Sequence, residues 1–147
     1  MEYGGVLEKL APCGLDCSRC VGFQEGEIKK LSTRLIELLE NYQRVAAIMQ
    51  KFNPAFASYK GFEDILQTFA QASCTGCRSI NNSCPTPCIV KTCHKEKAVD
   101  FCFQCPDFPC DKQAQIPIGE RWLQINQRLQ EIGAVEYYQE QNRLPRY

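Results

Sequence analysis

Cysteine is the residue type in this chain whose number and spacing could do chemistry. Eleven cysteines occur in 147 residues, three near the start and eight in a later segment. Two cysteines separated by two residues can turn both sulfurs toward one metal ion. The pairs Cys17–Cys20, Cys74–Cys77 and Cys102–Cys105 have this spacing. The predicted metal ligands are all eleven cysteines: Cys13, Cys17, Cys20, Cys74, Cys77, Cys84, Cys88, Cys93, Cys102, Cys105 and Cys110.

A tetrahedral metal site needs four ligands, and the three N-terminal cysteines leave one position open. We expect the fourth ligand to come from the segment after Ser73, so sulfur atoms from both parts of the chain must converge. Eleven cysteines and His94 could hold three four-coordinate ions, and two ions with spare thiols are an equal alternative. His94 follows Cys93 directly, and adjacent residues seldom bind the same ion, so a role for His94 as a ligand stays open.

Cysteine ligands suit both zinc and iron–sulfur clusters. Cys–Pro steps occur twice, but the bacterial ferredoxin run C-x2-C-x2-C-x3-C is absent. The N-terminal C-x3-C-x2-C spacing matches the cluster motif of radical S-adenosylmethionine enzymes, although Arg19 replaces their usual aromatic residue and the chain is short for their barrel. We therefore predict two or three zinc ions, with an iron–sulfur cluster as the alternative.

The start, Met1 to Gly5, is acidic, and no apolar segment typical of a secretion signal follows it. A thiol-rich chain in the cytosol is more readily a metal binder than a disulfide scaffold, and an odd number of cysteines leaves one thiol over. No apolar run approaches the roughly 20 residues that cross a bilayer. We expect a cytoplasmic protein with no membrane partner.

The charge balance argues against a nucleic-acid partner. Basic and acidic side chains number 17 each. Four thiolates outweigh the charge of one Zn²⁺, so metal binding would make the protein acidic. The small basic patch of Lys91, Lys95 and Lys97 is typical of a solvated surface.

Apolar periodicity predicts helices on both sides of the central Cys-rich segment. From Gln24 to Phe52 apolar residues recur at steps of 3 and 4, which predicts one helix about 40 Å long that ends at Asn53-Pro54. A second helix is predicted after the Lys60-Gly61 break. Similar spacing predicts a third helix over Gly119–Ile132, closed by a C-terminal glycine, and a short fourth over Ala134–Gln141.

The segment from Ser73 to Lys112 has no hydrophobic periodicity, so we predict that metal organises it. The predicted fold class is mainly α: a helical hairpin plus C-terminal helices around a Cys-rich, loop-rich region resembling a zinc ribbon or knuckle, with little or no sheet. Short strands near Ala98–Phe103 are an alternative. The predicted organisation is a single domain, residues 1–147, with metal-binding halves at 8–22 and 73–112, an inserted hairpin at 24–72 and C-terminal helices at 115–142.

The residues that usually accompany catalysis are missing. The chain has one histidine, no glycine-rich phosphate loop and no H-E-x-x-H motif. We therefore predict no catalytic residues and favour a zinc-stabilised module that allows an unidentified protein partner, with a redox protein as the alternative. Phe101, Phe103 and Phe108 could contact that partner, but we favour a role in shielding the metal sulfurs. Asp16 and Asp107, which lie close to cysteines, could act as acids or accept hydrogen bonds from metal ligands, but we expect them to cap turns.

Several motifs together resemble a known family. They are C-G-L-D-C-S-x-C at the start, C-x-G-C-R with C-x3-C-x4-C in the middle, and D-F-C-x-x-C-P-D-F-P-C near the end. Together with a late I-G-x-x-x-Y segment they resemble a Cys-rich microbial family, the domain of unknown function 3795, over roughly residues 8 to 137. The resemblance implies a cytosolic, metal-binding protein and supplies no established activity.

Overall fold

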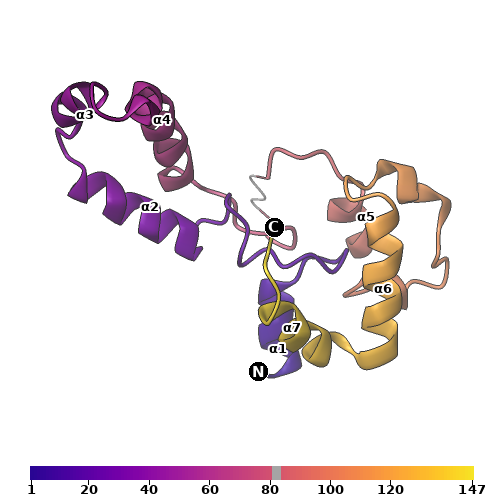
Figure 1. The fold of residues 1–147 in the computed structure, drawn as a ribbon. Coiled ribbons are helices and arrows are strands. Elements are labelled where there is room, and N and C mark those ends of the chain that lie inside the picture. Colours follow the sequence, from indigo (N-terminus) through magenta and orange to yellow (C-terminus); the bar gives the residue numbers. More distant parts are fainter. Residues whose placement is uncertain (81–83) are drawn as a thin grey trace. The chain divides into compact units, whose positions relative to one another are not determined.

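The structure is a computed structural model that describes residues 1–80 and 84–147. It is mainly helical, as predicted (Figure 1). No strand occurs in the described part of the chain, where an isolated antiparallel bridge joins Leu10 and Asp16. Residues near Ala98–Phe103, considered as a strand pair, instead lead into the short 3-10 helix η2 (Cys102–Gln104). No helix of the described residues is both long and apolar enough to cross a membrane.

The chain divides into two compact units. One comprises Val21–Ser73, and the other combines Met1–Cys20 with Cys74–Tyr147. All eleven cysteines belong to the second of these, which we call the cysteine unit, while the unit Val21–Ser73 is called the hairpin unit.

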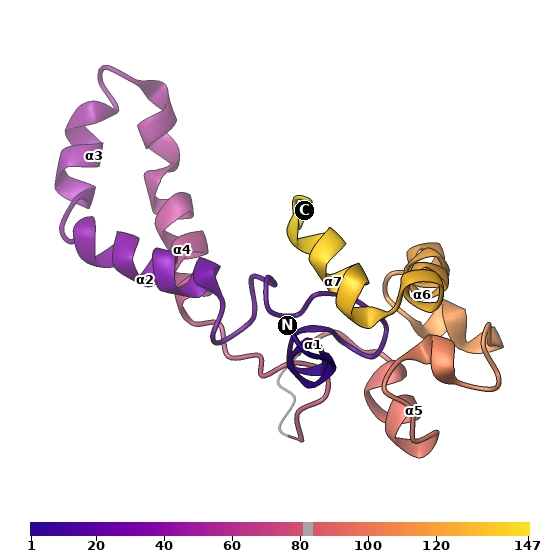
Figure 2. The same cartoon turned by 90° about the horizontal axis from the view of Figure 1, so that it is seen from below.

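The hairpin unit consists of three α-helices and one 3-10 helix (Figure 2). These are α2 (Glu27–Leu38), α3 (Gln43–Met49), η1 (Pro54–Ser58) and α4 (Tyr59–Ala70). Helices α2 and α4 pack against each other. The Lys29 ammonium donates a hydrogen bond to the Ala72 carbonyl (2.8 Å) at one end, and the Gln43 amide donates to Glu63 (2.7 Å) near the other.

The prediction of one continuous helix from Gln24 to Phe52 is wrong. Helix α2 ends at Leu38, the chain turns through Asn41, and helix α3 begins at Gln43. Asn41 has a φ of +62°, in the left-handed region that asparagine tolerates better than most residues. The steps of 3 and 4 continue through this turn, so periodicity alone gave no sign of the break.

The apolar residues that recur at steps of 3 and 4 in helix α2 were expected to face the core, but several of them face solvent. Leu38 is 64% exposed and Leu31 66%, whereas the buried residue of helix α2 is Ser32. Helix α4 instead buries Leu66, which is 8% exposed. Helices α2 and α4 therefore meet along one edge of the stripe and leave its outer edge open to solvent.

The boundaries near the second predicted helix are close to those observed. Asn53 caps the 3-10 helix η1 by accepting a hydrogen bond from the Ala55 amide at 3.0 Å, which explains the stop at Asn53-Pro54. Helix α4 begins at Tyr59, so Gly61 lies inside the helix and the break predicted at Lys60-Gly61 does not occur.

The cysteine unit contains helices at both ends and one in the middle. They are α1 (Tyr3–Lys9), α5 (Val90–Glu96), α6 (Glu120–Ile132) and α7 (Ala134–Asn142), with 3-10 helices η2 and η3 (Asp111–Gln115) between α5 and α6. The third and fourth predicted helices correspond closely to α6 and α7. Gly133 separates them with a φ of +80°, which confirms its predicted role at a helix end. Helices α1 and α5 were not predicted.

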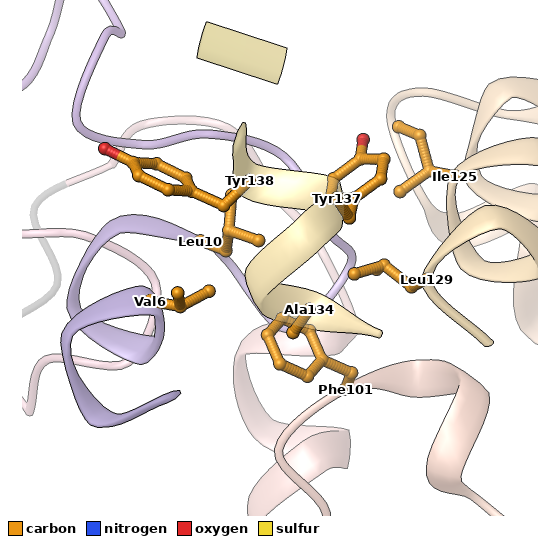
Figure 3. Packing of buried hydrophobic residues seen from close by; sticks show 8 residues of the cluster. All are labelled: Val6, Leu10, Phe101, Ile125, Leu129, Ala134, Tyr137 and Tyr138. Carbon is orange, nitrogen blue, oxygen red and sulfur yellow. The ribbon is translucent and has the colours of Figure 1, made fainter. Parts of the chain in front are cut away.

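A hydrophobic core joins the two ends of the chain. Helix α1 packs beside helix α7, and side chains from α6 complete the cluster (Figure 3). Phe101 is fully buried in this cluster, so it is not available to contact a partner. The labelled residues of the core are Val6, Leu10, Phe101, Ile125, Leu129, Ala134, Tyr137 and Tyr138.

Candidate metal centre

The N-terminal cysteine loop is shaped by backbone hydrogen bonds around a glycine. The Ala11 amide donates to the Leu15 carbonyl, and the Gly14 amide donates to the Ala11 carbonyl, both at 2.8 Å. Gly14 has a φ of +87°, which a residue with a side chain adopts only with strain. A Cβ atom there would lie 2.2 Å from Ile125 Cγ2, so the loop also depends on close contact with helix α6.

Asp16 holds the next turn of this loop. Its buried carboxylate accepts hydrogen bonds from the Ser18 amide (2.9 Å), the Ser18 hydroxyl (2.6 Å) and Arg19 Nε (2.7 Å). The predicted turn-capping role of Asp16 is therefore confirmed. Asp107, in contrast, pairs with Lys97 at 2.6 Å on the exposed side of the unit.

Four thiols from the two parts of the cysteine unit share one apolar cluster, and we call them the first thiol group: Cys13, Cys17, Cys77 and Cys88. Cys102 adjoins this group, because its charge also acts on Cys13 and it lies in the same cluster. The Cys17 thiol hydrogen-bonds with Cys77, which raises the pKa of Cys17, as does burial. Cys13 is only 5% exposed, and burial followed by neighbouring thiols raises its pKa to about 12. The group lies in an apolar cluster with Val90, Ile116 and Trp122.

A second thiol group surrounds a small cavity: Cys93, Cys102, Cys105 and Cys110. The cavity has a volume of about 30 Å³, and Phe108 and Trp122 form part of its wall. Burial is the main cause that raises the pKa of Cys102 to about 11, and the charges of Cys110 and Cys93 act in the same direction.

The remaining cysteines, Cys20, Cys74 and Cys84, form a looser third group. Burial is the largest cause that raises the pKa of Cys74, and Cys84, Cys77 and Cys20 contribute through their charges. The Gly76 amide donates to the Cys74 sulfur at 3.4 Å, and Gly76 has a φ of +89°, so it supplies the tight turn predicted for this clip. The carbonyl of Cys84 accepts a hydrogen bond from Lys91 (2.8 Å).

Several sulfurs accept hydrogen bonds from backbone amides two residues further on. Cys13 accepts from Leu15, Cys74 from Gly76 and Cys88 from Val90, and each of these contacts lowers the pKa of the thiol against the effect of burial. Such donors bind a thiolate more strongly than a neutral thiol, because charge-assisted hydrogen bonds are stronger. These donors offset part of the effect of burial, although the net pKa of each of the three thiols stays raised, and they would stabilise the thiolate that binds metal.

His94 and Trp122 each have a buried ring nitrogen without a hydrogen bond of normal geometry, and both line the cavity of the second thiol group. The indole N–H of Trp122 is close enough to the Cys102 sulfur to lower the pKa of that thiol. Burial lowers the pKa of His94, which favours the neutral ring. The uncharged imidazole is the form that binds metal, so His94 stays a candidate ligand beside the cavity.

The side chains of the thiol groups are not arranged around a common point as metal ligands would be. Within residues 1–80 and 84–147, no set of three or more His, Cys, Asp or Glu side chains has the geometry to hold a metal ion. None of the eleven cysteines, all of which lie in the described residues, forms a disulfide. Metal binding, the number of ions and their identity therefore stay predictions, whereas the chemistry of the donor set, sulfur ligands with amide donors in apolar surroundings, fits zinc.

Two polar residues that the sequence did not single out connect the thiol segments. Arg78 donates to the carbonyls of Leu10 (3.0 Å) and Asp100 (2.6 Å), and its guanidinium lies 4.9 Å from the centre of the Phe101 ring. Asn126, on helix α6, is fully buried and bonds to both cysteine segments. Neither belongs to a recognisable motif. The sequence signal for Arg78 is its position next to Cys77, and the signal for Asn126 is a polar residue among the apolar positions of a predicted helix.

The fold therefore defines a class of protein: a mainly helical, cysteine-rich protein whose thiols come together from three segments of the chain. The family model for a protein of unknown function (DUF3795) matches residues 9–115, and the chain belongs to that family. The matched range includes all eleven cysteines and ends before helix α6, so the late I-G-x-x-x-Y segment lies outside it. No curated protein and no solved structure matches the chain.

Proposed function

We propose that this protein is a zinc-binding module in which one ion joins the N-terminal cysteine loop to the segment after Ser73. The ligands of this ion are the first thiol group, Cys13, Cys17, Cys77 and Cys88. Its role is structural, with a protein partner and a place in the reducing cytoplasm.

The observation that carries this proposal is the contact between Cys17 and Cys77. These thiols lie in segments separated by the whole hairpin unit, yet they hydrogen-bond to each other beside the buried Cys13. Placing several thiols together in an apolar cluster is costly if they ionise alone, because like charges repel where water is excluded. A divalent cation removes that conflict and uses all four sulfurs.

Four protein sulfurs around one ion leave no coordination position for water or substrate. Closed sites of this kind are structural in zinc proteins, whereas catalytic sites keep one open position. A structural zinc ion contributes about 10–16 kcal/mol to folding, which equals or exceeds the stability of an ordinary domain of about 5–15 kcal/mol. The proposal requires the sulfurs to close around the ion by small side-chain rotations.

The test is the metal content and visible spectrum of protein purified without oxygen. We expect two or three zinc ions per chain and no visible absorbance. The double variant C17S/C77S should lose about one zinc ion, whereas Cys20→Ser, the matched control from the same loop, should retain this ion. A brown protein with a broad absorption band would support the iron–sulfur alternative instead. A metal-free protein whose helices and thermal unfolding are unchanged by chelation would contradict the proposal.

A further inference from the structure

Four cysteines from separate elements surround one cavity in the second half of the cysteine unit. Cys93 lies on helix α5, Cys102 and Cys105 begin and follow the 3-10 helix η2, and Cys110 precedes η3. All four line the same cavity of about 30 Å³. None of them belongs to the first thiol group, so the inference below does not require the proposed function to be correct.

Local hydrogen bonds hold these cysteines in a clip. The Cys105 amide donates to the Cys102 carbonyl at 3.1 Å, and the Phe108 amide donates to the Cys105 carbonyl at 3.0 Å. Each hydrogen bond closes a tight turn of the backbone. Zinc knuckles use such turns to present two sulfurs from cysteines separated by two residues. Helix α5 supplies Cys93 to the same cavity.

We propose that Cys93, Cys102, Cys105 and Cys110 form a second metal site, which binds one zinc ion through four thiolates. The site shares no ligand with the first thiol group, although Cys102 and Cys110 border the same apolar cluster as that group. The protein then carries at least two structural ions, one between its N-terminal and central segments and one between helix α5 and the loop before helix α6.

A buried indole N–H whose neighbour is a cysteine sulfur supports this assignment. Trp122 is 1% exposed, and its Nε1 has no hydrogen bond of normal geometry although it lies beside Cys102. Native proteins seldom leave a buried N–H unpaired. A metal-bound Cys102 sulfur is negative and would accept this N–H as a charge-assisted hydrogen bond, as ligands in metal sites commonly do.

Two lysines lie where the charge of such a site would need compensation. Four thiolates and one Zn²⁺ carry a net charge of about −2. The Lys112 ammonium lies 3.9 Å from the Cys93 sulfur, and Lys97 lines the open side of the cysteine cluster together with Lys112. Lys97 is already paired with Asp107, so Lys112 provides the direct compensation.

The size of the cavity favours a single ion. A volume of about 30 Å³ holds one or two water-sized bodies. An iron–sulfur cluster brings several iron and sulfide atoms, which do not fit this volume and would extend into the solvent-facing cavity of about 390 Å³ that Cys93, Cys105 and Cys110 also line. The ligand expected for this site is therefore a mononuclear, thiophilic divalent cation, and Zn²⁺ is the one that proteins use most in tetrahedral sulfur sites.

The first test uses zinc-loaded full-length protein without any substitution. Thiols are alkylated with N-ethylmaleimide during stepwise addition of a chelator, and the modified cysteines are identified by peptide mass spectrometry. We expect Cys93, Cys102, Cys105 and Cys110 to be protected by zinc and to become reactive together. Independent reactivity of these four thiols, or protection unaffected by the chelator, would overturn the proposal.

The second test compares two matched double variants by metal analysis. C102S/C105S should lose one zinc ion and keep the ion of the first thiol group, and C17S/C77S should show the reverse. If C17S/C77S retains all its zinc while C102S/C105S loses one ion, the proposed function fails and the second site stands. Wild-type zinc content in C102S/C105S would overturn the second site. Because a variant could misfold, circular dichroism of each is compared with wild type, and the alkylation result on the unaltered chain then decides.

Discussion

The side-chain amide of Asn126 donates a hydrogen bond of 3.1 Å to the backbone carbonyl of Cys13. The same amide nitrogen donates to the Trp122 carbonyl (2.9 Å), and the side-chain oxygen accepts from the Phe103 amide (3.1 Å). Asn126 is fully buried. One side chain on helix α6 therefore ties together the N-terminal cysteine loop and the Cys102–Cys105 clip.

Replacing Asn126 should destabilise the cysteine unit strongly. Asn126→Leu keeps a similar volume but leaves the Phe103 amide and the Cys13 carbonyl buried without their partner, and each unpaired group costs about 1–3 kcal/mol. We expect the free energy of unfolding to fall by about 2–4 kcal/mol in urea titrations followed by the fluorescence of Trp122, the single tryptophan. The control Asn142→Leu, at an exposed position of helix α7, should change it by less than about 0.5 kcal/mol. Equal effects of the two substitutions would contradict this role.

Gly14 should not tolerate a side chain. Alanine there combines a left-handed φ of +87° with contacts of 2.2 Å to Ile125 and 2.7 Å to Leu129. We expect Gly14→Ala to cost at least about 2 kcal/mol, because both backbone strain and overpacking oppose it. In the matched substitution Gly4→Ala, the new Cβ meets no atom within 4 Å and lies in helix α1, so stability should be equal or slightly higher. The same urea titration measures both, and a neutral Gly14→Ala would show that the loop adopts another conformation.

Substitution by alanine should lower the stability much more at Leu66 than at Leu38, although both leucines occupy apolar positions of predicted helices. Leu66→Ala removes a side chain that is 8% exposed between helices α2 and α4, and we expect a loss of about 2 kcal/mol or more. Leu38→Ala alters a side chain that is 64% exposed and should change stability by less than about 0.5 kcal/mol. Hydrogen exchange of the amides in α2 and α4 measures the hairpin unit separately. If Leu38→Ala lowers the stability more than Leu66→Ala does, Leu38 is part of the core, as the continuous apolar stripe predicted.

Metal removal should proceed in two phases if both proposed sites exist. Each group has thiols that line an open cavity of about 390 Å³, Cys17 and Cys77 in the first and Cys93, Cys105 and Cys110 in the second. The groups differ because Cys13 of the first is only 5% exposed, whereas all four thiols of the second are half-buried. A chelator should therefore extract zinc faster from the second thiol group than from the first, as followed by the absorbance of a zinc-sensitive dye. C102S/C105S should lack the fast phase and C17S/C77S the slow one. Loss of the slow phase in C102S/C105S would reverse the assignment of the two sites.

Much of the helical fold was accessible from local pattern. Helices α6 and α7 follow from apolar spacing and from Gly133, and the turn at Gly76 follows from the need for glycine at a positive φ. Helix α2 was located, but its end was not, because the steps of 3 and 4 pass through Asn41 without interruption. A periodic pattern reports which residues share a side of an ideal helix, and it does not report whether the backbone between them turns.

Long-range polar contacts were beyond sequence analysis. Arg78 and Asn126 acquire their importance because carbonyl and amide groups from other segments meet them inside the unit. Their residue types are common on surfaces, and nothing in their immediate neighbours distinguishes them. Ser32, buried on helix α2 while Leu38 is exposed, shows the same point for packing, since the partner helix decides which flank of an amphipathic helix is covered.

The amino-acid sequence by itself determined the donor set: eleven thiols, clips of two cysteines two residues apart, and helices on either side of a segment without apolar periodicity. Only the tertiary structure decided which thiols are neighbours, grouping Cys17 with Cys77 and Cys93 with the Cys102–Cys105 clip. The physical reason is that ligand chemistry is a property of each side chain and of short spacing, whereas proximity across the chain depends on how helices pack and where buried polar groups find partners.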